Sequence, residues 1–491
     1  MPTRAVSLTQ QLLRRQPVTG APVAQGASQH LRRSLGTFQL TMFGVGSTVG
    51  AGIFFVLAQA VPQAGPAVVL SFIVAGVAAA LAALCYAELS SAVPVSGSAY
   101  SYAYATLGEA LAIGVAACLL LEYGVAAAAV AVSWSEYLNE LFSKTCGFVV
   151  PQAISATPWA AQPGFINLPA VIIVAMCGLL LMCGASESAA VNTVIVLIKL
   201  GILVLFAAVA FTAFQANRFA DFAPFGVSGI SLAAGTIFFT YVGLDTISTA
   251  GDEVKDAKRT MPRAIIAALL IVTGVYLFVA VAALGAQPWQ DFKGQEAALV
   301  VIVDRVTGGT AGSAILAAGA VVSLFAVTLV TMYGQTRILF TMSRDGLLPA
   351  TFAKVNARTM TPVNNTAIVT VAVAMLAGLV PLNNLADMVS IGTLTAFIVV
   401  SLGVIVLRRR EPDLPRGFTV PGYPVTPILS VLACTYILLS LRWYTWIAFS
   451  GWVVAALIFY LAWGRRHSAL NTTMTKGAGA VPHQPPSSYS G

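Results

Sequence analysis

Long apolar stretches recur along almost the whole chain. They follow one another between Phe38 and Trp463, each near the roughly 20 residues that an α-helix needs to cross a bilayer. Charged residues make up only 9% of the sequence and hydrophobic residues 58%, so a water-soluble fold would expose much of its apolar surface. In lipid, backbone polar groups must be paired within the fold, and stretches of this length do so as helices. The sequence therefore predicts an all-α polytopic membrane protein with about 12 transmembrane helices.

The predicted spans are separated by connections too short to fold separately. We expect the spans at residues 37–60, 66–92, 106–135, 168–185, 189–214, 231–250, 263–285, 298–340, 364–381, 385–407, 424–441 and 444–463. The eighth is longer than one crossing needs, so we expect it to include a surface segment. The spans divide the chain into an N-terminal tail (1–36), a core of ten helices (37–408), two further helices with their preceding loop (409–464), and a C-terminal tail (465–491). The polar composition of both tails predicts that they are flexible.

Basic residues indicate how the chain is oriented in the membrane. With both termini in the cytoplasm, 20 of the 26 Lys and Arg residues fall inside, five fall outside, and Lys199 lies within a span. Such an excess is typical of cytoplasmic loops. The formal charge of +8 therefore indicates membrane orientation, and no nucleic-acid partner is needed to explain it.

Signatures of enzymes and cofactor sites are lacking in the sequence. The three histidines, His30, His467 and His483, all fall near the tails, and neither a Gly-rich phosphate loop nor a Gly-x-Ser-x-Gly elbow occurs. We therefore expect no enzymatic activity, no metal and no cofactor.

The first predicted span contains a concentration of glycine. Residues 43–54 read Phe-Gly-Val-Gly-Ser-Thr-Val-Gly-Ala-Gly-Ile-Phe, and each glycine inside a helix costs about 1 kcal/mol relative to alanine. Close packing of small residues against a neighbouring helix is the alternative explanation. It does not account for the polar Ser47-Thr48 pair, so we expect the helix to be broken there.

A second interruption is predicted in the sixth span, where Gly243 and the carboxylate of Asp245 interrupt an apolar run. The two breaks lie five helices apart. This offset predicts two five-helix repeats of inverted topology, each beginning with a discontinuous helix. Two further helices follow the repeats.

Broken helices expose backbone groups that can bind a zwitterion. Amides at the half-helix start, near Ala51, Gly52 and Ile53, are expected to attract a carboxylate. Freed carbonyls near Val45, Phe239 and Thr240 are expected to accept hydrogen bonds from an ammonium group. The backbone of an amino acid carries both groups on one carbon, so we predict an amino acid substrate.

Lys199 lies centrally in the fifth span with apolar neighbours on both sides. Loss of water disfavours its charged form, which suggests that it gains and loses a proton as the protein changes conformation. A permanently charged lysine that ties helix 5 to carbonyls of the broken first helix is the alternative.

Two carboxylates also fall within spans. Glu122 in the third span either pairs with another helix or contacts a substrate amine, and both interpretations stay open. Asp245 lies at the second break, where it is more simply explained as a partner of freed amides. Glu88 and Arg337 lie near span ends, where ion pairing or solvation is expected.

Five ordered tracts resemble a known family. They are Gly46-Ser-Thr-Val-Gly-Ala-Gly-Ile-Phe54, Tyr86-Ala-Glu-Leu-Ser-Ser-Ala-Val-Pro-Val-Ser-Gly-Ser-Ala-Tyr-Ser-Tyr102, Tyr241-Val-Gly-Leu-Asp245, Tyr333-Gly-Gln-Thr-Arg337 with Met342-Ser-Arg-Asp-Gly-Leu-Leu-Pro349, and Pro412-Asp-Leu-Pro415 before Val420-Pro-Gly-Tyr-Pro424. From Leu35 to Trp463 the chain resembles the amino acid–polyamine–organocation (APC) superfamily, and within it bacterial members of the cationic amino acid transporter subfamily. After the sixth span it departs from the family, reading Asp252-Glu-Val-Lys-Asp-Ala257 where an Asn-Pro ending is usual.

The resemblance implies a carboxylate-binding stretch at Thr48, Gly50, Ala51 and Gly52, and an aromatic gate at Phe239. It also implies that Lys199 replaces a sodium ion and that Glu122 is the subfamily's acid in helix 3. Side-chain selectivity is expected from helices 3, 6, 8 and 10, with Leu324, Phe325 and Thr328 as candidates on helix 8.

The expected function is secondary active transport of amino acids across the cytoplasmic membrane by alternating access, without sodium and coupled to protons. An obligate exchanger, or a channel or substrate sensor on the same scaffold, is the alternative. Cationic and neutral substrates both stay open, as do the oligomeric state and the role of the tails.

Overall fold

The computed structural model describes residues 35–93, 98–160, 162–184, 189–249, 254–295, 297–356, 358–359 and 361–468. Within these residues the regular secondary structure is helical, apart from one isolated bridge between Leu35 and Val254. Most of the two predicted tails, and residues 252 and 253 of the departure noted above, lie outside the described residues. The predicted flexibility of the tails therefore stays a prediction.

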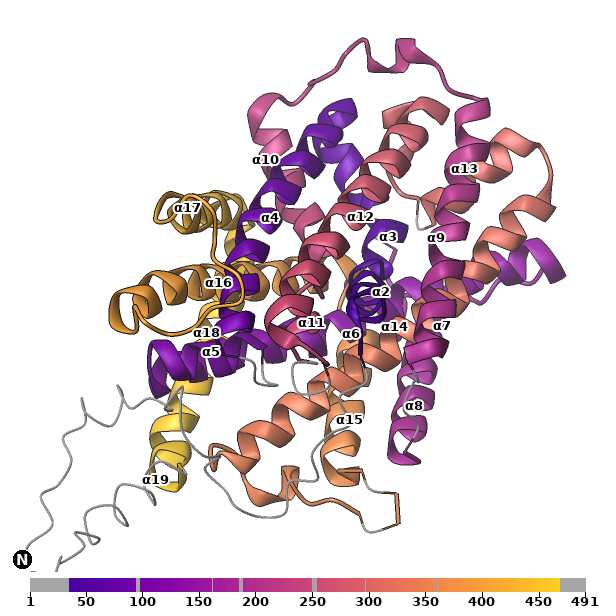
Figure 1. Cartoon of the computed structure of the whole chain (residues 1–491). Helices are drawn as coiled ribbons and strands as arrows, with labels where there is room; N and C mark the ends of the chain where they lie inside the picture. The colour runs from indigo at the N-terminus through magenta and orange to yellow at the C-terminus, as the bar shows by residue number, and fades with distance from the viewer. Residues whose placement is uncertain are drawn as a thin grey trace, which may run out of the picture.

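Among the described residues, eight helical stretches are long and apolar enough to cross a membrane, and three shorter apolar helices accompany them, which confirms the predicted polytopic all-helical fold (Figure 1). We group the helices as twelve crossings. In chain order the crossings are α2 (Thr37–Thr48) with α3 (Ala51–Ala64), α4 (Val68–Ala92), α6 (Glu109–Cys146), α8 (Leu168–Met182), α9 (Ala189–Thr212), α10 (Gly226–Phe238) with η3 (Phe239–Tyr241) and α11 (Thr246–Thr249), α12 (Ala257–Ala286), α14 (Thr310–Arg344), α15 (Val363–Leu379), α16 (Leu382–Arg410), α17 (Val425–Leu439) and α18 (Trp443–Phe459). The first and sixth crossings are the broken ones, as the five-plus-five repeat requires.

Short helical segments connect the crossings. They are η1 (Gly65–Ala67), α5 (Ser98–Thr106), α7 (Gln152–Ser155), η2 (Ala216–Phe219), η5 (Trp289–Phe292), α13 (Ala298–Thr307), η6 (Ala350–Phe352), η7 (Tyr460–Gly464) and α19 (Arg465–His467). The long predicted eighth span thus divides into α13 and α14. Gly308 ends α13 with a φ of 62°, a left-handed conformation that glycine adopts without steric cost.

The largest difference between a predicted and an observed boundary is at the end of the third crossing. The third crossing was expected to end near residue 135, whereas α6 continues to Cys146. Polar residues such as Asn139 and Glu140 lower the hydropathy of this last part, although they do not break the helix. Apolar content therefore located the end of the apolar stretch but not the end of the helix.

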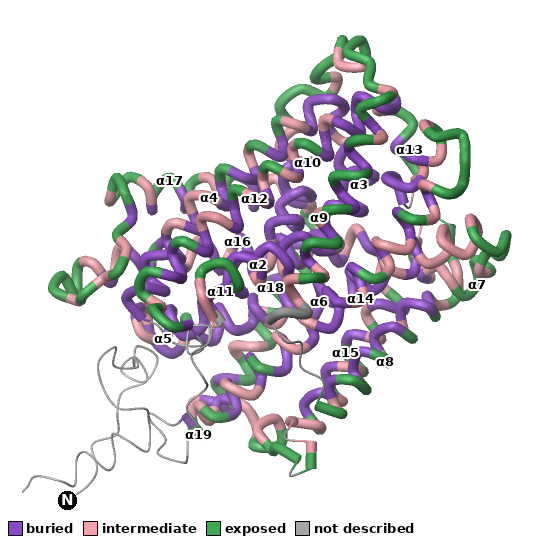
Figure 2. The backbone as a smooth tube through the Cα atoms, turned by 45° about the vertical axis from the view of Figure 1, so that its right-hand side comes forward, coloured by how far each residue is buried: buried purple, intermediate pink, exposed green. Residues whose placement is uncertain are grey.

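α6 lies at the centre of the molecule and packs against α14 and α16. Of its most apolar stretch, 94% is buried inside the protein, against 11% for the corresponding stretch of α18. Figure 2 shows the buried residues running through the middle along α2 and α6, with exposed ones at the periphery. The outer helices expose large apolar side chains such as Leu432 on α17 and Ile447 on α18, as expected for surfaces that face lipid.

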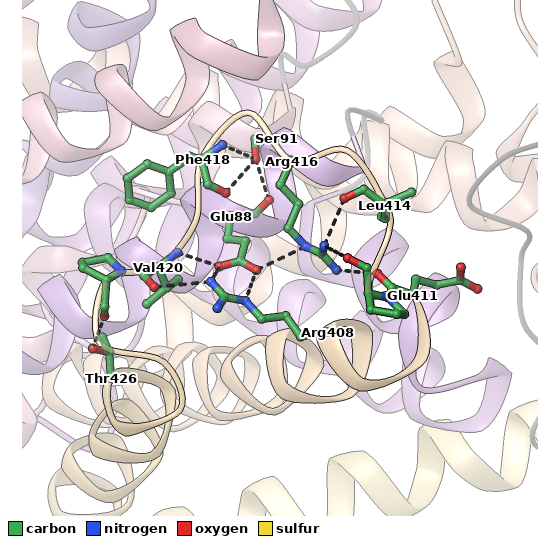
Figure 3. Close-up of polar contacts among 11 residues, drawn as sticks. Glu88, Ser91, Arg408, Glu411, Leu414, Arg416, Phe418, Val420 and Thr426 are labelled. Atoms are coloured by element: carbon green, nitrogen blue, oxygen red, sulfur yellow. Dashed lines mark hydrogen bonds and ion pairs between the residues drawn. The ribbon is translucent and has the colours of Figure 1, made fainter.

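A cluster around Glu88 fastens the loop between α16 and α17 to the C-terminal end of α4 (Figure 3). Arg408 Nε and Nη2 donate to Glu88 Oε1 and Oε2 at 2.7 and 2.5 Å. Arg416 Nε lies 3.5 Å from Oε1, and the Val420 N–H donates to Oε2 at 2.7 Å. Glu88 is buried, so these donors compensate its lost hydration. The expected ion pairing of Glu88 is confirmed.

Candidate functional site

The first crossing is interrupted at Val49 and Gly50, between the end of α2 and the start of α3. The N–H groups in the first turn of α3, which include those of Gly52 and Ile53, have no carbonyl partner within their own helix. The helix dipole adds a partial positive charge at the same point. The start of α3 is therefore suited to bind a carboxylate.

The second break lies in the turn at residues 242–245, between η3 and α11. Gly243 has a φ of 99°, which residues with a side chain rarely adopt. A Cβ atom at Gly243 would lie 2.9 Å from Ser47 O, and one at Gly52 would lie 2.7 Å from Thr240 Cα. The two breaks therefore touch each other through positions where only glycine fits.

Tyr276 on α12 joins the two breaks. Its hydroxyl lies 2.8 Å from Thr48 O and 2.8 Å from Thr240 O. Because a hydroxyl carries a single proton, it donates to one carbonyl at a time or shares the bond between them. Tyr276 thus satisfies carbonyls that the breaks release and keeps the two unwound segments together.

A cavity lies against both breaks. Its lining comes from α2, α3, α6, η3, the turn at 242–245, α11 and α14, and consists of Ser47, Thr48, Gly50, Gly52, Glu122, Tyr123, Ala126, Val130, Phe239, Val242, Gly243, Thr246, Val327, Val330 and Thr331. The space open to the centres of water molecules is about 30 Å³, which is room for about two waters. A larger molecule therefore requires lining side chains to move.

Two carboxyl groups are buried beside this cavity. Asp245 Oδ2 accepts hydrogen bonds from Ser98 Oγ at 3.0 Å and from Tyr123 Oη at 3.3 Å. Glu122 is its charged neighbour, and among the described residues neither Glu122 oxygen nor Asp245 Oδ1 has a well-formed hydrogen bond. Two adjacent carboxylates in a buried site repel each other strongly. The pair is therefore a candidate site for binding a proton.

Lys199 is buried on α9, and its Nζ donates to Gly46 O at 3.1 Å. This bond joins helix 5 to the last turn of α2. This hydrogen bond agrees with a lysine that holds helix 5 against the broken first helix. It agrees equally with proton coupling, because loss of the lysine's proton would weaken the bond.

The structure brings about half of the predicted site residues together. Those that line the cavity are Thr48, Gly50, Gly52, Glu122, Phe239 and Gly243, whereas Val45, Ile53, Thr240, Asp245 and Lys199 lie outside its lining. The side chain of Ala51 lies outside the described part of the chain. Asp245 nevertheless contacts a lining residue, Tyr123. Lys199 contacts Gly46, next to the first break.

Three predicted contacts need correction. Val45 O accepts the Val49 N–H at 2.7 Å and Phe239 O accepts the Val242 N–H at 3.2 Å, because the chain closes a local turn at each break. Each of these two carbonyls therefore already accepts one backbone hydrogen bond, and only its second lone pair is open to a ligand. The Asp245 carboxylate, expected to bind freed amides, accepts instead from two side-chain hydroxyls of other segments.

The candidates on helix 8 do not line the cavity. Val327, Val330 and Thr331 of α14 line it, whereas Leu324 and Thr328 are buried one row away on the same helix, with Thr328 Oγ1 donating to Leu324 O at 2.9 Å. The sequence did not indicate which of the neighbouring rows of α14 meets the cavity. Ser47 and Tyr123 were also missed as lining residues, although each adjoins a predicted one.

Comparisons with known proteins agree with the resemblance. The family model described as amino acid permease matches residues 35–475. The chain is 40% identical to the branched-chain amino acid permease BcaP of Bacillus subtilis (strain 168), over 94% of this chain and 99% of the relative. It is also 40% identical to the methylthioribose transporter of the same organism, over 91% of this chain and 97% of the relative.

Eukaryotic relatives are more distant. Cationic amino acid transporter 4 of Homo sapiens is 34% identical over 79% of this chain and 61% of the relative. A family model that covers almost the whole membrane core, together with relatives aligned over nearly their full length, establishes the membership. The chain belongs to the amino acid permease family of the APC superfamily.

Proposed function

We propose that this permease carries neutral amino acids with aliphatic side chains across the cytoplasmic membrane, by alternating access and with a proton. The observation that carries the proposal is the cavity between the two touching breaks, with half-helix amides on one side and a buried carboxyl pair on the other. The amides suit the substrate carboxylate. Some transporters of this architecture use a sodium ion, and we assign the place of that ion to Lys199 in this chain.

The substrate class is argued from the rest of the lining. Ala126, Val130, Val242, Val327 and Val330 contribute aliphatic side chains. Glu122 lies beside Asp245 and is not an isolated counter-ion. The cationic side chain of a substrate such as lysine would therefore disturb the Glu122–Asp245 pair. The name of the BcaP relative agrees with an aliphatic substrate. The other relative, named for methylthioribose, makes that sugar the second candidate.

Two titratable sites are candidates for the coupled proton. Protonation of the Glu122–Asp245 pair removes repulsion beside the cavity, and loss of a proton from Lys199 weakens its bond to Gly46 O. We assign the proton to the carboxyl pair and a positioning role to Lys199, because the pair adjoins the cavity. The orientation with both termini in the cytoplasm follows from the excess of basic residues on that side.

Uptake into proteoliposomes tests the proposal. The panel holds labelled leucine, isoleucine, valine, lysine and methylthioribose, in sodium-free buffer, with the lumen either alkaline or at the external pH. We expect accumulation of an aliphatic amino acid only with the alkaline lumen. Uptake at the same rate with and without the pH gradient would refute the proton coupling. Uptake that requires amino acid preloaded in the lumen would show an obligate exchanger. Binding of substrate without transport would show a sensor. Currents that do not saturate would indicate a channel.

Two variants separate the coupling candidates. Glu122→Gln is expected to abolish the pH dependence while counterflow at equal pH continues, and Lys199→Ala to slow both. If Lys199→Ala alone removes the pH dependence with counterflow intact, the lysine carries the proton.

A further inference from the structure

Three polar residues follow one another on a buried face of α16. Asp387, Ser390 and Thr393 recur at a spacing of three, which places them near one another along one side of a helix. All three are buried, with 4%, 0% and 0% of their surface exposed. Polar side chains inside a membrane-spanning helix are costly and usually mark a pathway or a functional site. The proposed substrate cavity does not account for them, because none of the three lines it.

Two members of this stripe (Asp387, Ser390 and Thr393) are incompletely bonded. Among the described residues, Asp387 Oδ2 and Ser390 Oγ are buried without a hydrogen-bond partner. Arg442, in the connection between α17 and α18, lies 3.6 Å from Asp387 Oδ2. Its Nη1 donates to Tyr444 Oη at 2.7 Å instead. A carboxylate kept only to anchor Arg442 would be expected to accept that bond, so the loose pair leaves Asp387 free to bind a proton.

The outer end of the stripe lies beside a partly exposed residue, Arg442. Asp387 lies in the second turn of α16, at the end opposite Arg408, Arg409 and Arg410. Arg442, which is 34% exposed, is the one charged group that acts on Asp387 among the described residues. With the termini in the cytoplasm, this end of α16 faces the external side.

The inner end of the stripe reaches Glu122. A Cβ atom at Gly392 would lie 3.1 Å from Cys118 O, so α16 and α6 touch one turn away from Glu122. The Thr393 hydroxyl lies beside the Glu122 carboxyl group and donates its own proton to Val389 O at 3.1 Å. At 1.5 Å per residue, the six residues from Asp387 to Thr393 cover about 9 Å of helix.

We propose that Asp387 is the external proton acceptor of this permease and that it passes protons to Glu122 along Ser390 and Thr393. The proposal rests on the proton coupling proposed above. Each hydroxyl accepts a proton on its oxygen as it donates its own to the next acceptor, so one proton enters at Asp387 and one arrives at Glu122. Side chains three residues apart are about 5–6 Å apart at Cβ, a gap that one bridging water spans at each step.

Asp387→Asn in the full-length protein, reconstituted in proteoliposomes, tests the proposal. The wild type must first show uptake of an aliphatic amino acid driven by an alkaline lumen. In Asp387→Asn, we expect the pH-driven rate to fall about tenfold, whereas counterflow at equal pH stays within about twofold. Asp291→Asn is the matched control, because Asp291 also pairs with an arginine, Arg305, at 2.7 Å but is exposed.

Ser390→Ala and Arg442→Gln separate a pathway from an anchor. Ser390→Ala is expected to slow pH-driven uptake and Ser390→Thr, which keeps the hydroxyl, to restore it. Arg442→Gln removes the cation that favours ionised Asp387, so the pathway predicts that pH-driven uptake persists with its external pH dependence displaced to higher pH. An anchoring role predicts that Arg442→Gln and Asp387→Asn lose counterflow alike.

Each outcome decides a different point. A wild type that ignores pH would overturn the proposed coupling, and this inference with it. A pH-driven wild type that is matched by Asp387→Asn would overturn the pathway alone, as would equal loss of counterflow in Asp387→Asn and Arg442→Gln. If Asp387→Asn does not fold, normal pH-driven uptake by Ser390→Ala is the result that overturns the pathway.

Discussion

Replacing Gly52 with alanine is the most direct test of the contact between the two breaks. A Cβ atom at Gly52 would lie 2.7 Å from Thr240 Cα, with Thr240 Cγ2 and Cβ at 2.8 and 2.9 Å. Ordinary carbon–carbon contacts are about 3.5–4.0 Å. The start of α3 and the η3 segment must therefore move apart by about 1 Å, because a backbone atom cannot rotate away as a side chain can.

The magnitude follows from packing. An added methyl group in a close-packed site costs about 1–3 kcal/mol, of which the better helix propensity of alanine offsets at most about 1 kcal/mol. Because the clash falls on a backbone atom, we take the upper end of this cost with the full offset, and expect Gly52→Ala to lower the free energy of unfolding by about 2 kcal/mol. If the closed, substrate-bound arrangement needs the same contact, substrate affinity falls about tenfold.

Thermal unfolding in detergent and binding of a labelled aliphatic amino acid measure the two effects. Gly201→Ala is the matched control, because it lies within α9 and a Cβ atom there meets nothing within 4 Å. In the double variant with Thr240→Gly, we expect only partial recovery, because the Thr240 Cα atom stays in place. Wild-type stability and affinity in Gly52→Ala would refute the close contact of the breaks, and full recovery in the double variant would show that side-chain atoms alone cause the effect.

Three further variants test other contacts. Tyr276→Phe leaves two buried carbonyls without their hydroxyl donor, at a cost of about 1–3 kcal/mol, so its unfolding midpoint should fall and counterflow should slow; an unchanged midpoint would contradict the bridge. Glu88→Gln should cost about 3–5 kcal/mol, because it leaves the arginine partners of a buried carboxylate unpaired, whereas Asp291→Asn at an exposed pair should cost less than about 1 kcal/mol; equal losses would argue against the Glu88 cluster. Burial raises the pKa of Asp345, which lies just beyond the end of α14, so its ionisation opposes folding. Asp345→Asn should therefore gain stability relative to wild type as pH rises above the unfolded pKa of about 4. If the unfolding midpoints of Asp345→Asn and wild type differ by the same amount at every pH, this explanation is excluded.

Features that depend on neighbours in sequence were predictable. The run of glycines around Gly50 and the isolated Gly243 located both breaks, because glycine weakens a helix wherever it stands. The burial of Lys199 and Glu122 followed from the apolar residues on either side of each. These are local properties, and the fold class needed nothing more.

Helix rotation and contacts between distant segments were not predictable. α14 presents Val327, Val330 and Thr331 to the cavity, and its pattern of apolar and polar residues does not indicate which of them face a ligand and which face a neighbouring helix. The meeting of Glu122 with Asp245 joins residues more than a hundred positions apart, on different helices. Nothing in the sequence distinguishes Asp387 and Ser390 from other polar residues. Only the packing of α16 against α6 shows that the stripe they form leads toward Glu122.

The amino-acid sequence by itself determined the polytopic helical fold and the two breaks, and it predicts the orientation of the basic loops. Each of these follows from hydropathy, glycine content or charge, which act over one helix or less. The tertiary structure alone decided which atoms meet at the breaks, such as Tyr276 Oη with Thr48 O and Thr240 O. Those contacts depend on how helices rotate and pack against one another, and that is set by the shapes of all their neighbours together.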